Sequence, residues 1–151
     1  MRYSQLRKRE VDKIKKLLME LYGFSTPLDW VFYFLGKNKV WLLKKDFFNL
    51  PIDKLNVEVM GIYFCHLDDN VFRLSTEGAM IVGKKAKFNI LNITQKEAYE
   101  LIRGFNIEKN TDLTADYLIL KSPGGIIGVG KNHRTKILCQ IKKQRRIKNI
   151  N

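Results

Sequence analysis

The sequence has few of the residues from which metal centres and disulfide scaffolds are built, with two cysteines and two histidines in 151 residues. Cys65 and Cys139 are too few for a disulfide framework and lack the spacing of metal ligands. Cys65 lies in an apolar run, which favours a buried free thiol. His133 has no neighbouring carboxylate that would orient it as a general base. We therefore expect a protein with no metal, no cofactor and no catalytic activity.

Long apolar segments are also missing. No window approaches the roughly 18 apolar residues of a membrane-spanning helix, and the N-terminus lacks the apolar stretch of a signal peptide. These absences predict a soluble, cytoplasmic protein with no membrane partner. A phosphate-binding loop is absent as well, because Lys131 is followed by Asn132 instead of serine or threonine and no helix is expected there. The glycines in residues 124–130 are better explained by a strand that another backbone approaches closely.

Acidic residues are absent from Tyr117 to the C-terminus, where nine lysines and arginines occur. Residues 1–20 hold seven basic and three acidic residues, whereas residues 21–116 hold twelve of each. The formal net charge of +13 is thus concentrated at the two ends of the chain. Because such an excess opposes the compact state through self-repulsion, it indicates a polyanionic partner, and a nucleic acid is favoured over an anionic membrane surface.

The first half of the chain is expected to combine helices with paired strands. Apolar residues at helical spacing predict a helix over residues 5–22, ended by Gly23. Packing of its apolar stripe on the domain is favoured over contact of this basic helix with phosphates or lipid. Further elements are predicted as a hairpin (30–35 and 40–43), a short helix (44–50), two strands (56–67 and 71–74) and a helix capped by Ser75 (to residue 82). Trp30 and Trp41 are expected in the core instead of stacking on bases, and Asp68-Asp69 is expected to be a solvated turn.

The second half begins with a strand predicted over residues 88–93. Thr94 and Glu97 form a capping box that opens a helix to Ile102, and Arg103-Gly104 closes it. After a polar loop (108–115), three strands are predicted at 117–121, 126–131 and 137–141. Short strands with few helices indicate an α+β chain whose C-terminal half is a compact barrel.

Several of these stretches together resemble one known family. They are Gly61–Tyr63, Phe72–Ala79, Arg103–Gly104, Gly124–Lys131 and Lys143–Arg146. In combination they are similar to a pre-PUA plus PUA module, over roughly residues 57–148. The module resembles the C-terminal RNA-binding region of the Sun/Nop-type RNA cytosine-5 methyltransferases and their stand-alone archaeal relatives linked to ribosome biogenesis. The resemblance implies a small N-terminal α/β pre-PUA region (1–83) followed by a PUA-type β pseudo-barrel (84–151).

The family binds RNA against the helix that carries Arg103-Gly104 and the nearby final strand. The resemblance therefore implies a non-catalytic RNA-binding protein, because 151 residues leave no room for the methyltransferase domain. The RNA would be structured rRNA or tRNA, and a further partner would be an RNA-modifying enzyme or a pre-ribosomal particle. The residues expected to contact RNA are Arg103, Gly104, Lys121, Lys131, His133, Arg134, Lys136, Lys142, Lys143, Arg145 and Arg146.

Two other functions are compatible with the charge. A protein-interaction adaptor would use its basic ends to meet acidic partners, with the aromatic N-terminal region as the interface. DNA binding is the other function, but the sequence contains neither a helix-turn-helix pattern nor a zinc-binding pattern. RNA binding is the function that the sequence favours.

Overall fold

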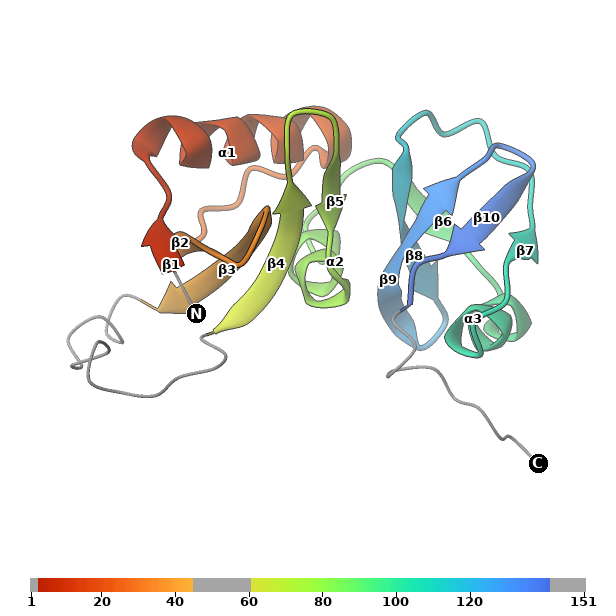
Figure 1. The fold of residues 1–151 in the computed structure, drawn as a ribbon. Coiled ribbons are helices and arrows are strands. Elements are labelled where there is room, and N and C mark those ends of the chain that lie inside the picture. Colours follow the sequence, from red (N-terminus) through yellow and green to blue (C-terminus); the bar gives the residue numbers. More distant parts are fainter. Residues whose placement is uncertain (1–2, 45–60, 142–151) are drawn as a thin grey trace.

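The computed structural model describes residues 3–44 and 61–141, which form an α+β protein with three helices and two five-stranded sheets. Figure 1 shows the two sheets side by side, with helix α2 between them. The first sheet contains β1 (Tyr3–Gln5), β2 (Trp30–Leu35), β3 (Lys39–Lys44), β4 (Ile62–Leu67) and β5 (Phe72–Leu74). These strands follow one another in chain order, and each is antiparallel to its neighbour.

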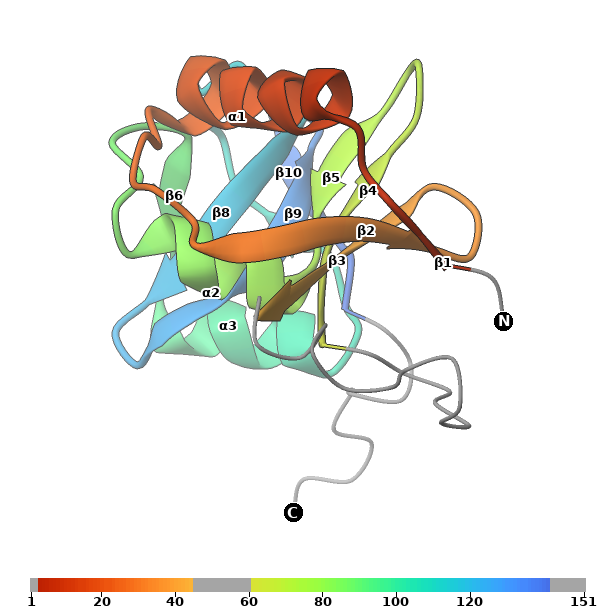
Figure 2. The ribbon, with the colours of Figure 1, turned by 90° about the vertical axis from the view of Figure 1, so that its left-hand side faces the viewer.

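Helix α1 (Lys8–Tyr22) lies across one face of the first sheet (Figure 2). Its apolar stripe is buried through Ile14, Leu18 and Tyr22, so the expectation that this helix packs on the domain is confirmed. The predicted end is also confirmed, because Gly23 adopts a left-handed conformation (φ 64°) and its N–H donates to the carbonyl of Met19.

The predicted start of this helix was wrong. Residues 3–5 form β1 and pair with β2, Tyr3 lying opposite Leu35. The helix begins after Arg7, whose N–H donates to the Glu10 carboxylate at 3.0 Å. Arginine is not a favoured N-cap residue, so the sequence carried no start signal at this position.

The predicted hairpin is confirmed as β2 and β3, and the strand after the Asp68 turn is confirmed as β5. Helix α2 (Thr76–Gly83) begins as expected, because the Ser75 hydroxyl accepts the N–H of Gly78 at 2.8 Å. The same hydroxyl donates to the carbonyl of Tyr63 on β4. One serine therefore both caps α2 and fastens it to the first sheet. The short helix predicted at 44–50 and the start of the strand predicted at 56–67 lie almost wholly outside the described residues.

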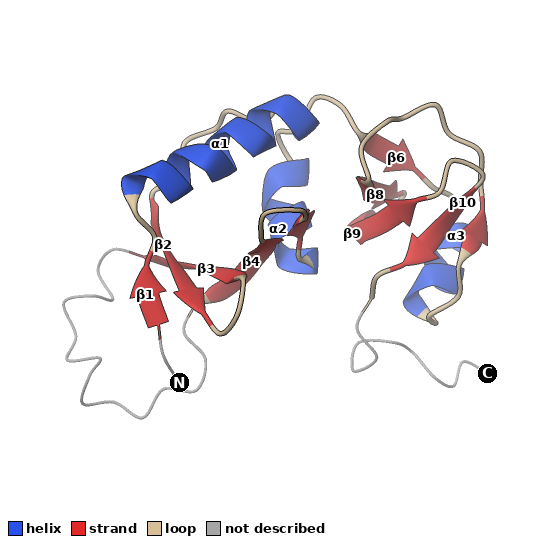
Figure 3. Ribbon diagram, turned by 45° about the horizontal axis from the view of Figure 1, so that its top comes forward, coloured by secondary structure: helices blue, strands red, loops and turns tan. Residues whose placement is uncertain are grey.

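The second sheet has the strand order β6-β8-β9-β10-β7, and it curls into a half-barrel. Its strands are β6 (Ile90–Asn92), β7 (Ile107–Glu108), β8 (Tyr117–Ser122), β9 (Gly125–Asn132) and β10 (Lys136–Cys139). Among the described strands of this sheet, β6 alone runs parallel to its neighbour, β8. Helix α3 (Gln95–Ile102) joins β6 to β7 (Figure 3). The C-terminal half thus has the α+β composition that was expected. Its described strands form an open sheet, because the edge strands β6 and β7 do not pair with each other.

Two predicted strand boundaries in this half were inaccurate because of side-chain contacts between distant residues, and one strand was missed. Strand β6 starts later than expected because Asn89 has a positive φ (58°) and its amide donates to the carbonyl of Leu21. Strand β10 ends earlier than expected because the Asn106 side chain accepts a hydrogen bond from the N–H of Cys139. Strand β7 was not predicted, since two residues give no periodic pattern.

The core joins the two halves of the chain. A first cluster lies between α1, α2 and the first sheet, yet it includes Ile119 of β8 and Val129 of β9. A second cluster lies under α3. Trp30 packs against the first cluster and Cys65 is fully buried there, as expected for both. Burial raises the pKa of the Cys65 thiol, which keeps it neutral and unreactive.

Candidate functional site

Helix α3 is fixed at its N-terminus by the predicted capping box. The Thr94 hydroxyl accepts the N–H of Glu97, and the Glu97 carboxylate accepts the N–H of Thr94 at 2.9 Å. Lys109 also donates to Glu97, at 3.0 Å. Partial burial tends to raise the pKa of Glu97, but the hydrogen bonds from Thr94 and Lys109 outweigh it and hold that pKa below its ordinary value. The helix that carries Arg103-Gly104 is therefore held in a defined position.

The C-terminal end of α3 presents an exposed aromatic platform. The Arg103 guanidinium lies over the ring of Phe105, 5.2 Å from its centre. Phe105 is 51% exposed, and Tyr99, one turn earlier on α3, is 37% exposed. Gly104 has a φ of 97°, which glycine adopts readily. The chain reverses direction at this residue, and the Phe105 ring therefore lies against the Arg103 guanidinium. We call Tyr99, Arg103 and Phe105 the α3 platform.

The α3 platform lies beside the end of the last described strand. Asn106 accepts the N–H of Cys139 at 2.9 Å, and the Cys139 thiol contacts the carbonyl of Leu101 at 3.2 Å. The expected proximity of Arg103-Gly104 to the final strand is therefore present. The remaining candidates on that side of the chain, Lys142, Lys143, Arg145 and Arg146, lie outside the described residues.

Three other candidates lie together at the opposite end of β10. His133, Arg134 and Lys136 occupy the β9–β10 turn and its first strand residue, and all three are exposed. The loop after β7 runs alongside, since Thr111 donates its N–H to the carbonyl of Arg134. This loop brings the exposed residues Asp112 and Asp116 to the turn, and the exposed Glu108 on β7 lies opposite Lys136. The basic region that contains no acidic residue in sequence is therefore not free of acidic neighbours in the fold.

Lys131 and Lys121 lie far apart on the second sheet. Lys131 on β9 is opposite Tyr117, so both side chains project from the face that looks toward the first sheet. Lys121 lies at the other end of β8, between Asn92 and Ile126. Those predicted residues that the structure describes therefore do not form one compact patch, because α3, the β9–β10 turn and the far end of β8 each carry some of them.

A row of alternating cations and aromatic rings connects the two sheets, and it was not predicted from the sequence. Lys39 lies 5.7 Å from the centre of the Tyr63 ring, and Arg73 lies 5.9 Å from the centre of the Tyr117 ring. Burial raises the pKa of Tyr63, although the charge of Arg73 and its hydrogen bond to the phenol act in the opposite direction. We call this row, which comprises Lys39, Tyr63, Arg73, Tyr117 and Lys131, the inter-sheet row.

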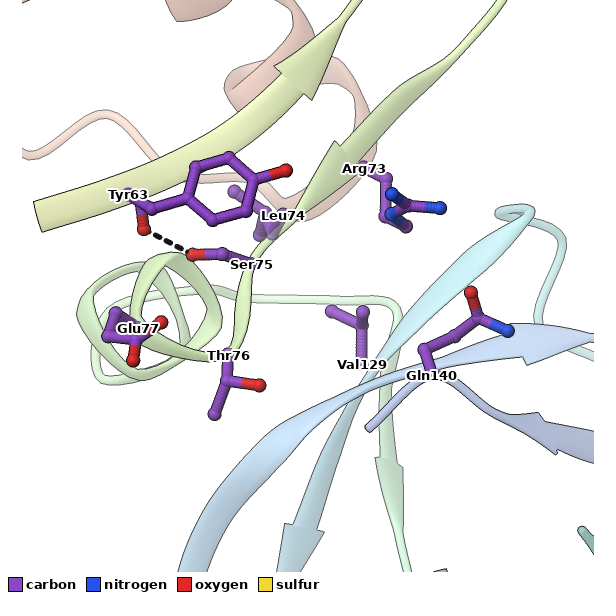
Figure 4. Close-up of a pocket in the computed structure, with 8 residues that line it drawn as sticks. All are labelled: Tyr63, Arg73, Leu74, Ser75, Thr76, Glu77, Val129 and Gln140. Atoms are coloured by element: carbon purple, nitrogen blue, oxygen red, sulfur yellow. Dashed lines mark hydrogen bonds between the residues drawn. The ribbon is translucent and has the colours of Figure 1, made fainter. Parts of the chain in front are cut away.

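The inter-sheet row borders a pocket of about 150 Å³. Figure 4 shows Tyr63 and Arg73 from the first sheet facing Val129 on β9 and Gln140 just after β10, with the start of α2 closing one side. The complete lining comprises Tyr63, Arg73, Leu74, Ser75, Thr76, Glu77, Val129 and Gln140. No local pattern could have revealed this pocket, because its walls come from segments more than fifty residues apart.

Metal binding finds no support in the described part of the chain, where no group of three or more histidine, cysteine or acidic side chains gathers. Asp68 accepts a hydrogen bond from the His66 ring at 2.8 Å and further bonds from the N–H groups of Asn70 and Val71. These contacts lower the pKa of Asp68 to about 2. Asp68 thus fixes the turn before β5, the role expected for it.

Comparisons with known proteins add no identification. No family model matches the sequence, and no curated protein matches it. Among residues 3–44 and 61–141, no helix has the length and apolar character needed to cross a membrane.

Proposed function

We propose that this protein binds structured RNA, either rRNA or tRNA, without catalysing a reaction. The observation that carries the proposal is the α3 platform, where Arg103 lies over the exposed ring of Phe105. Unpaired bases stack on aromatic rings and on guanidinium planes, and arginine also grips phosphate. The surplus of basic over acidic residues adds a general attraction to polyanions.

The proposal includes a PUA-type fold for residues 84–151. The curled second sheet, with α3 inserted between β6 and β7, supports it. So does the position of Arg103 beside the final described strand. In this proposal the protein acts in the cytoplasm, in ribosome biogenesis or as a targeting partner of an RNA-modifying enzyme.

Replacing Arg103 and Phe105 together by alanine should weaken tRNA or rRNA-fragment binding roughly 30-fold, since one lost stacking contact costs about 1–3 kcal/mol. Filter binding at constant salt measures the effect. The matched control is Arg9→Ala with Phe88→Ala, because these residues are also exposed but lie away from α3. Equal affinities for the two double variants would contradict the placement of RNA on the α3 platform.

A second function, an adaptor for acidic protein partners, is favoured by one groove. It has a volume of about 420 Å³ and lies between α1 and the following loop. Apolar residues such as Met19, Phe24 and Leu28 line it, and Lys15 and Lys16 border it. Met19 is 47% exposed. An apolar floor with a basic rim complements an acidic, amphipathic segment of a partner.

Met19→Glu should reduce binding of acidic amphipathic peptides at least tenfold, because it places a repelling charge inside the apolar groove. Fluorescence anisotropy with labelled peptides measures this, with lysine-rich versions of the same peptides as a specificity check. Met80→Glu, on the exposed face of α2, is the control for the added charge. If no acidic peptide binds the unmodified protein, the adaptor function is rejected.

A further inference from the structure

The pocket between the two sheets has the size and chemistry of a site for a small planar ligand. Its volume of about 150 Å³ is roughly half that of the smallest pockets that enclose drug-sized ligands, about 300 Å³. Two of its walls are apolar, formed by Val129 and by the ring of Tyr63. Such a space admits one heteroaromatic ring and excludes a base pair.

Polar groups around the pocket match the edge of a nucleobase. A guanidinium, a hydroxyl, a carboxylate and an amide line it, from Arg73, Thr76, Glu77 and Gln140. They combine donors with acceptors, as the hydrogen-bonding edge of a base requires. The Ser75 hydroxyl is engaged within the protein by Gly78 and Tyr63, and the Gln140 amide donates one hydrogen bond to the carbonyl of Cys139 at 3.0 Å.

Cations lie on both sides of the same pocket. Lys39 lies over Tyr63 on the side of the first sheet, whereas Lys131 projects beside Tyr117 from the second. Both lysines are exposed. A nucleotide whose base entered the pocket would therefore have its flanking phosphates near positive charge on each side.

We infer that this pocket takes one unstacked nucleobase of the bound RNA, with the inter-sheet row holding the neighbouring phosphates. The inference rests on the proposed RNA-binding function and adds a single-base site distinct from the α3 platform. Extruding an unpaired base costs little, so single-stranded loops of a structured RNA are the expected ligands.

A short oligouridine that carries one central fluorescent aminopurine tests the inference. Entry of this base into the pocket should unstack it and raise its fluorescence on binding. Gln140→Phe fills the pocket from its rim and should abolish the fluorescence rise and weaken binding about tenfold. Gln5→Phe, an exposed substitution on β1 away from the pocket and from α3, should leave both unchanged.

A second variant guards against misfolding of the first. Arg73→Gln keeps a polar, hydrogen-bonding side chain but is shorter than arginine and removes the cation over Tyr117, and it should also abolish the fluorescence rise. If both variants bind the probe with an unchanged fluorescence rise, the base-binding pocket is overturned while RNA binding stands. If the unmodified protein binds neither this probe nor structured RNA, the proposed function fails as well.

Discussion

Raising the salt concentration from about 50 to about 200 mM should weaken RNA binding roughly 1,000-fold if about six phosphates are contacted. Each contacted phosphate releases bound counterions, so the logarithm of the binding constant falls linearly with the logarithm of the salt concentration. Because the chain has 28 basic and 15 acidic residues, we expect counterion release to contribute to its affinity for RNA. Filter binding over a salt series measures the slope, and affinity that does not respond to salt would contradict the proposal.

The slope of this salt dependence can show which of the predicted lysines, Lys131 or Lys121, contacts a phosphate. Lys131→Ala should lower its magnitude by about 0.7, the value for one lost phosphate contact on a single strand. Lys121→Ala should leave the slope unchanged, because Lys121 lies at the opposite end of β8 from Tyr117 and the inter-sheet row. If Lys121→Ala changes the slope as much as Lys131→Ala does, the RNA path crosses the far end of β8 instead.

Gly78→Ala should lower the free energy of unfolding by about 3 kcal/mol, the upper range for overpacking in a core. A Cβ atom at residue 78 would lie 2.1 Å from the carbonyl oxygen of Phe64. Because the added Cβ is bonded directly to the backbone of α2 and the carbonyl oxygen belongs to the backbone of β4, α2 would have to move away from β4. That movement would also disturb the hydrogen bond between Ser75 and Tyr63. Urea unfolding measures the loss.

Gly124→Ala is the matched control for this prediction. Its added Cβ would have only the Ser122 hydroxyl nearby, at 3.8 Å. The substitution should therefore change the free energy of unfolding by less than about 0.5 kcal/mol. Equal unfolding midpoints for the two variants would show that α2 does not depend on its close approach to β4.

The parts of the fold that the sequence predicted well are those with local signals. Two helix starts were predicted from capping patterns that span no more than four residues. Helix α2 begins directly after Ser75, and helix α3 begins directly after Thr94, which forms its capping box with Glu97. By contrast, β1 forms because residues 3–5 pair with β2, which lies some thirty residues later in the chain. Strand β7 likewise depends on β10. Pairing between distant segments has no local pattern, so these strands could not be predicted.

The candidate site was predicted only in part, for a similar reason. Arg103-Gly104 came from a family resemblance, and its position next to the last described strand agrees with that expectation. The aromatic residues were expected in the core, which is correct for Trp30 and Phe64. Tyr63 instead takes part in the inter-sheet row, because neighbouring strand residues alternate between the two faces of a sheet. Acidic neighbours of the β9–β10 turn also came from a loop twenty residues away.

The shared core has a consequence for how this chain can be divided. Ile119 and Val129 belong to the second sheet but complete the cluster beneath α1 and α2. Cutting the chain after Gly83 would leave these two side chains without their partners and would expose the inner face of α2. The two halves are therefore expected to unfold in a single cooperative transition, and neither half is a suitable fragment for separate expression.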